Sequence, residues 1–133
     1  ESLFSNTDLF VVNEIELESM SKNSLQLDSI DSVMANIESI SLNKNQSIIV
    51  TLGSTGVFIN HANKQEFIEG HNVEAVDTTG SGDCFLGALA SSLVKNENLF
   101  DAAAYANKAA ALSVTKKGAS ASMPTHQDVL KFL

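Results

Sequence analysis

Arginine is absent from this sequence, and basic residues of any kind are few. The chain has 8 lysines against 16 aspartates and glutamates, which gives a formal net charge of −8. Such a chain repels a polyanion such as DNA or RNA on average, and no basic patch offsets the repulsion. We therefore expect no nucleic-acid partner. Any anion that binds must be held by lysine, by backbone N–H groups, by a helix N-terminus or by a metal ion.

Cysteine and long apolar runs are also scarce. Cys84 is the single cysteine, so the chain forms no intrachain disulfide, which favours a reducing compartment. No run approaches the roughly 18 apolar residues of a membrane span, and residues 1–5 lack the basic and apolar regions of a signal peptide. These absences predict a cytoplasmic location and no membrane partner. The sequence starts without Met, from which we expect it to be part of a longer protein.

What remains is the composition of a globular domain. Hydrophobic residues make up 44% and charged residues 18% of the 133 positions, so the chain can bury a core. We expect one domain, or a large piece of one, over residues 1–133. Short apolar runs alternate with amphipathic stretches, which is typical of α/β folds.

The apolar and β-branched patterns locate the expected elements. Strands are expected over residues 8–12 (buried), 47–52 (central) and 73–76, with a hairpin made by residues 57–59 and 66–68. Helices are expected over residues 14–20, 28–40, 82–95 and 99–115, with a last helix capped by Thr125.

The segment with the most chemical information is Asp77-Thr78-Thr79-Gly80-Ser81-Gly82-Asp83. Its glycines allow a tight turn and a close approach to the backbone, and the N–H groups that begin the next helix can bind an anion. Without arginine, this is the best phosphate cradle in the sequence. Asp83 fits two interpretations: an ordinary acidic residue in the first helical turn, or a general base for an attacking hydroxyl. Cys84 should be a small packed residue, although a helix N-terminus could lower its pKa.

Four segments, in order, resemble the ribokinase, or PfkB-type, carbohydrate kinases. Residues 77–83 are similar to the family's DTxGxGD signature, and Asn13-Glu14-Ile15-Glu16 is similar to its NxxE element. Residues 50–57 resemble the strand and turn of its nucleotide site, and residues 109–124 resemble its C-terminal segment. The resemblance implies the C-terminal part of a ribokinase-like three-layer α/β/α fold with an edge hairpin. The N-terminal part, which carries the substrate site and the lid, would be absent.

The resemblance also implies roles for single residues. Asp83 would deprotonate a sugar hydroxyl and contact the substrate, and the amides of Gly80, Ser81 and Gly82 would form an anion hole for the transferring phosphoryl group. Glu16 would hold Mg²⁺ through water. ATP contacts are implied for Asn13, Thr51, Leu52, Gly53, Ser54, Thr55, Gly56, Gly82, Asp83 and Asn107. The spacing of Asn13 and Glu16 equally fits a helix cap followed by a solvated glutamate.

A monovalent cation site beside the anion hole is a further implication of the resemblance. Oxygen ligands suit a hard cation such as K⁺, which would order the loop without touching the substrate. The implied ligands are the Asp77 carboxylate, the Ser122 hydroxyl or carbonyl, and the backbone carbonyls of Thr79, Ser113, Lys116 and Gly118. The side chains of Lys116 and Lys117 can at the same time form a solvated helix end.

The implied reaction is the ATP-dependent phosphorylation of a sugar hydroxyl, from D-ribose to ribose 5-phosphate, with ATP, Mg²⁺ and K⁺ bound. A homodimer is the implied assembly of the full-length protein. Two alternatives stay open: another PfkB-type kinase, such as a fructokinase or nucleoside kinase, and a non-catalytic nucleotide-binding module. The chain by itself is expected to be inactive, because substrate positioning supplies much of the rate.

Overall fold

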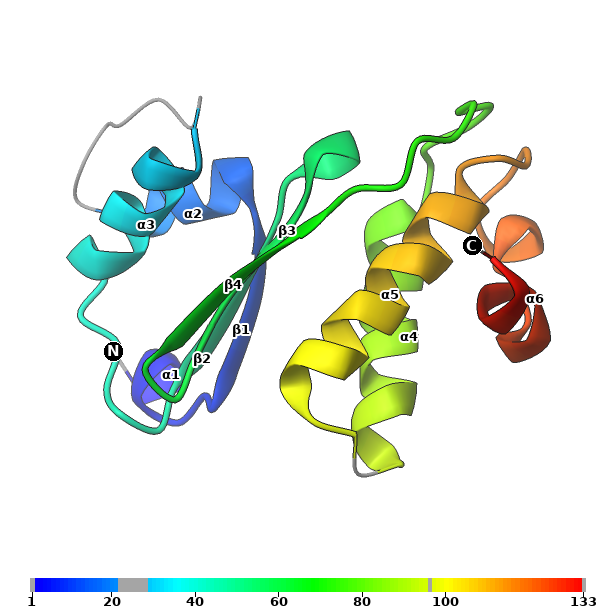
Figure 1. The fold of residues 1–133 in the computed structure, drawn as a ribbon. Helices are drawn as coiled ribbons and strands as arrows, with labels where there is room; N and C mark the ends of the chain where they lie inside the picture. The colour runs from blue at the N-terminus through cyan, green and yellow to red at the C-terminus, as the bar shows by residue number, and fades with distance from the viewer. Residues whose placement is uncertain (1, 22–28, 96, 133) are drawn as a thin grey trace. The chain divides into compact units, whose positions relative to one another are not determined.

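The computed structural model describes residues 2–21, 29–95 and 97–132 (Figure 1). The chain divides into two compact units. The first comprises Glu1–Gly53 and Val57–Phe67, and the second comprises Ser54–Gly56 and Ile68–Leu133. The expectation of a single domain over residues 1–133 stays a prediction.

A four-stranded mixed sheet runs in the order β1-β2-β3-β4. The strands are β1 (Leu9–Asn13), β2 (Ser47–Thr51), β3 (Gly56–His61) and β4 (Lys64–Glu69). β1 pairs with β2 in parallel, and β2 pairs with β3 antiparallel. The β-branched run of β2 therefore forms the predicted central strand, in which Ile48, Ile49 and Val50 are fully buried.

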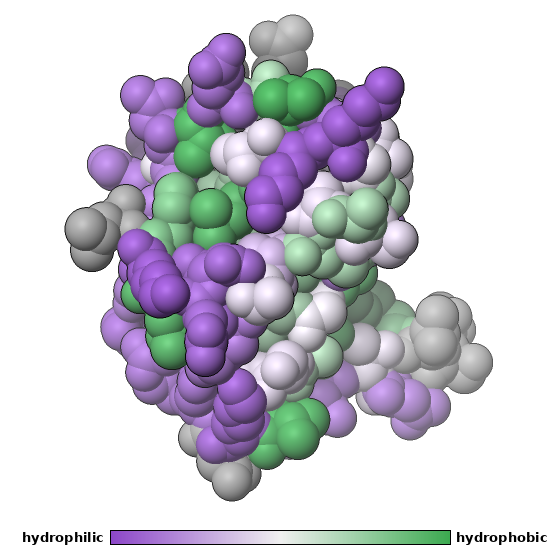
Figure 2. Space-filling model, turned by 90° about the vertical axis from the view of Figure 1, so that its right-hand side faces the viewer, coloured by the Kyte–Doolittle hydropathy of each residue, from purple (hydrophilic) through white to green (hydrophobic). Residues whose placement is uncertain are grey.

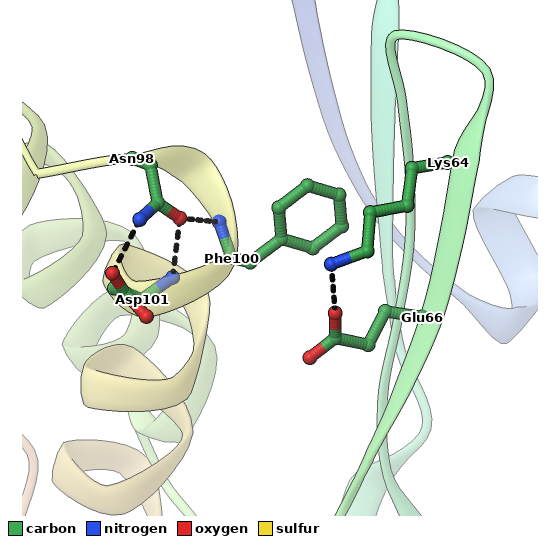
Figure 3. Close-up of polar contacts among 5 residues, drawn as sticks. All are labelled: Lys64, Glu66, Asn98, Phe100 and Asp101. Atoms are coloured by element: carbon green, nitrogen blue, oxygen red, sulfur yellow. Dashed lines mark hydrogen bonds and ion pairs between the residues drawn. The ribbon is translucent and has the colours of Figure 1, made fainter.

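The predicted edge hairpin is confirmed as β3 and β4. Ala62 and Asn63 connect its strands with φ angles of 51° and 63°, and two such left-handed residues suit a tight hairpin turn. On β4, Lys64 and Glu66 form an exposed ion pair at 2.8 Å (Figure 3). An exposed pair of this kind contributes about 0–1 kcal/mol to stability.

The described residues of the first unit contain the helices α1 (Ser2–Ser5), α2 (Glu14–Met20) and α3 (Ile30–Ser39). α2 has the predicted bounds, and α3 lies inside the predicted range, of which residue 28 lies outside the described residues. Leu17 and Ile37 pack with Val50 and Phe58 in the core of this unit. Full burial of each such side chain is worth about 1.5–3 kcal/mol.

β1 is less buried than the sequence predicts. Of its residues only Val12 is buried, and a hollow of about 520 Å³ lies beside it, lined in part by Phe4, Phe10 and Met20. The prediction of a buried strand is wrong at this point because β1 is at the end of the sheet order, with a strand partner on one side among the described residues.

The second unit is built from α4 (Ser81–Val94), α5 (Leu99–Ser113) and α6 (His126–Lys131). α4 and α5 pack along each other (Figure 1), and alanines on α5 such as Ala102, Ala106 and Ala109 are buried, which allows a close approach of the two helices. The predicted helices over residues 82–95 and 99–115 correspond to α4 and α5. Thr125 caps α6 as predicted, because its side chain accepts from the Asp128 amide.

The predicted strand over residues 73–76 is wrong. These residues form no strand in the described part of the chain, and Val76 is 63% exposed. The segment is instead extended chain whose Val76 N–H donates to the Val114 carbonyl at 2.8 Å. A short apolar run needs a neighbouring strand to form a ladder, and sequence alone does not supply that neighbour.

Apolar side chains also reach the surface, where Figure 2 shows green patches between hydrophilic purple ones. Large exposed examples are Leu86 and Val94 on α4 and Leu130 on α6. Across the described residues, no helix is both long enough and apolar enough for a membrane crossing.

Candidate functional site

The start of α4 is the centre of the candidate site. Its N-cap is Gly80, with φ 77° and ψ 10°, a left-handed conformation that favours glycine. The first intrahelical bond runs from the Cys84 amide to the Gly80 carbonyl at 2.9 Å, so the amides of residues 80–83 precede the helical ladder. The Ser81 amide donates to the Thr78 carbonyl at 3.2 Å and closes the turn. Of the three predicted anion-hole amides, that of Ser81 thus has a partner inside the loop.

α4 differs from its neighbours in how it begins. In the described part of the chain, no side chain accepts from the first amides of α4. The N-termini of four other helices are capped by side chains, namely those of Asn13 for α2, Ser29 for α3, Asn98 for α5 and Thr125 for α6. The orphan amides of α4 are therefore the ones suited to an external anion.

Asp83 and Gly82 lie on the outer side of this first turn. Both residues are exposed, and a Cβ atom built on Gly82 would have no heavy atom within 4 Å. The protein itself therefore gives no packing reason for glycine at position 82. A ligand that approaches the backbone closely would give one, and the exposed Asp83 carboxylate is accessible to the same ligand.

Asp77 ties the loop before α4 to the loop after α5. Its Oδ1 accepts from the Thr79 amide at 3.0 Å, and its Oδ2 accepts from the Gly118 amide at 2.9 Å. The Thr79 hydroxyl, followed by the Gly118 and Thr79 amides, holds the pKa of Asp77 below the ordinary aspartate value. The sequence predicts Asp77 as a cation ligand, and the structure adds this bridging role.

The other predicted K⁺ ligands lie in the same unit. Ser113 is buried at the end of α5, and its carbonyl accepts from the Lys116 amide at 3.3 Å. Ser122 is 1% exposed, and its hydroxyl donates to the Ala119 carbonyl at 2.8 Å. These oxygens and the ionised Asp77 have the chemistry that a hard cation needs. Among the described residues, no group of three or more His, Cys, Asp or Glu is arranged to hold a metal ion.

Asn13 and Glu16 form a reciprocal helix cap. The Asn13 Oδ1 accepts from the Glu16 amide, and the Glu16 Oε2 accepts from the Asn13 amide, each at 2.9 Å. This capping box starts α2. The cap interpretation of the NxxE spacing is thus confirmed, and the roles in binding ATP and Mg²⁺ stay predictions.

The turn predicted to line the ATP site has a structural reason for one of its glycines. Gly56 has φ 131°, and a Cβ built on it would lie 2.1 Å from the Ile68 carbonyl oxygen. Gly70 approaches the same turn, since its amide donates to the Thr55 carbonyl at 2.8 Å and its Cβ would lie 2.0 Å from the Ser54 carbonyl oxygen. Sequence reasoning did not single out Gly70. Close backbone packing therefore fixes glycine at both positions.

The remaining predicted nucleotide contacts are divided between the two units. In the first unit, Thr51 is the last residue of β2, and the buried Leu52 and Gly53 follow it. Asn107 is buried in the second unit, where its Nδ2 donates to the Glu69 carbonyl at 2.9 Å. Its amide group therefore bonds to the backbone of Glu69 within the same unit, and its contact with adenine stays a prediction.

Cys84 is packed, as predicted, but its pKa moves in the other direction. Burial raises the pKa of the thiol, and Sγ lies 3.5 Å from the Ala109 carbonyl oxygen. The expectation of a lowered pKa is wrong because the side chain points into the α4–α5 contact, where desolvation disfavours the thiolate.

Comparison with known proteins relates this geometry to kinases. Residues 1–126 match the family described as pfkB family carbohydrate kinase. The chain is 42% identical over 88 residues to the ribokinase of Haemophilus influenzae and 37% identical over 128 residues to that of Staphylococcus aureus. These matches cover 66% and 96% of the chain but 29% and 41% of the relatives. Fructokinase-1 of Oryza sativa is 34% identical over 99% of the chain and 41% of its own length.

Solved structures of ribokinases have the same fold. An Arabidopsis thaliana ribokinase complexed with ribose and ATP matches 98% of this chain and 42% of its own, with a TM-score of 0.86 and 28% identity. An E. coli putative ribokinase II in complex with ATP and Mg²⁺ matches 98% of this chain and 40% of its own, with a TM-score of 0.80 and 27% identity. The α/β fold class predicted from the sequence is confirmed, and the chain belongs to the pfkB family of carbohydrate kinases.

Proposed function

We propose that this chain is the nucleotide-binding and catalytic part of an ATP-dependent sugar kinase that converts D-ribose to ribose 5-phosphate. The observation that carries the proposal is the start of α4, where uncapped amides and the exposed Asp83 lie in one helical turn. A transferring phosphoryl group is an anion that such amides stabilise, and a carboxylate beside it can activate the attacking hydroxyl.

The proposed reaction is an in-line displacement. Asp83 takes the proton of the sugar hydroxyl while the hydroxyl oxygen forms a bond to the γ-phosphorus of ATP. The bond from that phosphorus to the bridging β–γ oxygen breaks, and ADP leaves. The amides at Gly80 and Gly82 stabilise the charge on the phosphoryl oxygens, while the Ser81 amide holds the turn through Thr78.

Two cations belong to the proposal. Glu16 is exposed and one of its oxygens caps α2, so the carboxylate can still hold Mg²⁺ through water, which suits a cation that dehydrates reluctantly. Mg²⁺ would neutralise charge on the ATP phosphates. Asp77, together with oxygens of Thr79, Ser113, Lys116, Gly118 and Ser122, would hold K⁺, which would order the turn before α4.

The choice of sugar rests on the relatives that this chain resembles. The ribokinase relatives favour ribose, whereas the match to rice fructokinase over 99% of the chain favours fructose as the alternative. The match leaves out more than half of the length of these relatives. We propose that the equivalent part of the natural protein supplies sugar binding and a dimer contact. A cytoplasmic location is proposed because Cys84 is a buried free thiol.

A coupled ADP-release assay on the natural protein that contains this chain tests the proposal. Ribose, fructose, adenosine and no sugar are compared at saturating Mg²⁺-ATP, with K⁺ and with Na⁺ in its place. We expect turnover that depends on ribose and increases with K⁺. Turnover with fructose or with adenosine, but not with ribose, would identify the protein as another kinase of the same family. ATP binding without turnover on any sugar would favour the non-catalytic module.

A further inference from the structure

The turn that begins α4 is anchored to the segment after α5 by hydrogen bonds. The Val114 carbonyl accepts from the amides of Val76 at 2.8 Å and Asp77 at 3.1 Å. The Asp77 carboxylate in turn accepts from the Gly118 amide at 2.9 Å. Within the turn, the Thr79 amide donates to the Asp77 carboxylate and the Ser81 amide donates to the Thr78 carbonyl. Gly80 makes a further contact with the segment after α5.

That contact is made by Ala119. A Cβ atom built on Gly80 would lie 3.0 Å from the Ala119 Cβ and 3.3 Å from its Cα, so the backbone of Gly80 packs directly on Ala119. Ala119 is itself held, because its carbonyl accepts from the Ser122 amide at 3.2 Å and from the Ser122 hydroxyl at 2.8 Å. Ser122 is 1% exposed. The surface that Gly80 meets is therefore anchored in the interior of the second unit.

We propose that Ala119 is a positioning residue for the anion hole, acting through Gly80. Gly80 has a left-handed backbone and no side chain, and no side-chain cap holds the start of α4 among the described residues. The direction of the amides from Gly80 to Asp83 consequently depends both on the hydrogen bonds within the turn and on the Ala119 surface that Gly80 rests against. The inference builds on the proposed kinase function, in which a misplacement of about 1 Å lowers turnover by about a hundredfold.

Four proteins form a double-mutant cycle that tests this role: wild type, Gly80→Ala, Ala119→Gly and the double variant. In the single variant Gly80→Ala, the added methyl group meets the side chain of Ala119. In the double variant, Ala119→Gly has removed that side chain and leaves space for the methyl group. The strain of alanine at φ 77° is present in both and cancels in the comparison. Ala121→Gly is the matched control, because Ala121 is an exposed alanine two residues further along, in the short 3-10 helix Ser120–Ser122.

We expect Ala119→Gly to lower kcat by about tenfold with the KM for ATP nearly unchanged, and Gly80→Ala to lower it by about a hundredfold. The double variant should be several-fold more active than Gly80→Ala. Ala121→Gly should match the wild type. Equal kcat values for Ala119→Gly and Ala121→Gly, or a double variant no better than Gly80→Ala, would overturn the positioning role while leaving the kinase function in place.

A second readout does not require turnover. The ¹H–¹⁵N resonances of Gly80 and Gly82 report the environment of their amides, and we expect them to shift in Ala119→Gly and to stay in place in Ala121→Gly. Unchanged resonances in Ala119→Gly contradict the proposal. If the wild-type protein had no kinase activity but the Gly80 and Gly82 resonances still shifted in Ala119→Gly, the proposed function would be refuted and the Gly80–Ala119 contact supported.

Discussion

The first turns of α4 and α5 both contain an aspartate, but the two helices differ in how their N-termini are capped. Each has an aspartate as its third residue, Asp83 in α4 and Asp101 in α5. At α5 the Asn98 Oδ1 accepts from the amides of Phe100 and Asp101 at 3.0 Å, and the Asn98 side chain also bonds to the Asp101 carboxylate (Figure 3). At α4 the N-cap is Gly80, without a side-chain bond in the described part of the chain.

The difference separates a helix start that is capped from within the protein from one whose amides we propose as a ligand site. A side-chain cap satisfies the orphan amides internally and contributes about 1 kcal/mol. A glycine N-cap leaves those amides to an external partner. An acidic residue in the first turn of a helix therefore fits both an ordinary structural role and a role as general base. Whether the N-cap of that helix carries a side-chain bond helps to distinguish the two.

The largest expected effect comes from exchanging the two aspartates for asparagine. Asp83→Asn removes the proposed base, and we expect kcat to fall by about a thousandfold in the ADP-release assay, since general-base catalysis contributes about 10²–10⁴. Asp101→Asn removes the equivalent carboxylate of α5 and should leave kcat unchanged. If both variants turned over at similar rates, the distinction between the two helix starts would be lost.

The next effect concerns the two exposed glycines of α4. A Cβ on Gly82 or on Gly87 meets nothing within 4 Å, so alanine should be tolerated at both positions and add up to about 1 kcal/mol of helix stability. We expect Gly82→Ala to lower kcat by about ten- to a hundredfold, because its methyl group obstructs phosphate. Gly87→Ala should retain full activity. Urea unfolding measured alongside the kinetics separates the two effects, and an active Gly82→Ala enzyme argues against a close phosphate approach.

The reverse pattern is expected at the start of α5. Asn98→Ala removes the acceptor for two amides and should cost about 1 kcal/mol of unfolding free energy. Turnover at saturating substrate should be unaffected at temperatures where the protein is folded. The measurement is urea denaturation of the variant and the wild type. A variant that loses activity without losing stability would place α5 in the catalytic machinery.

The smallest effect is the pH dependence of the α6 cap. The Thr125 hydroxyl and amide bond to Asp128 and hold its pKa below the ordinary value of 3.8. The charged cap therefore stabilises the fold fully above pH 3.8, and its contribution is lost as the pH falls through the lower folded-state pKa. We expect Asp128→Asn to be less stable than wild type at neutral pH, with the gap closing in acid. A gap of constant size in stability curves recorded across that range would contradict this.

Local sequence was sufficient for most of the elements. The bounds of α2 are predicted because Asn13 and Glu16 cap it and Leu17 faces the core, and the hairpin is predicted because turn residues separate two apolar runs. The strand over residues 73–76 was not predictable, since a strand requires a neighbour that those residues do not specify. The same limit applies to β1, whose burial depends on its place in the sheet order.

The sequence by itself determined the family, the glycine loop, the acidic residue after it and the caps of α2 and α6, because each is specified by residues a few positions apart. Tertiary structure decided how that loop is held. Asp77 bonds to Gly118, 41 residues away, and Gly80 rests on Ala119. Contacts at such separations exist only because α4 and α5 pack side by side and return the chain to its starting end. The direction of the α4 amides thus depends in part on contacts that form only in the packed unit, and the local sequence motif does not specify these contacts.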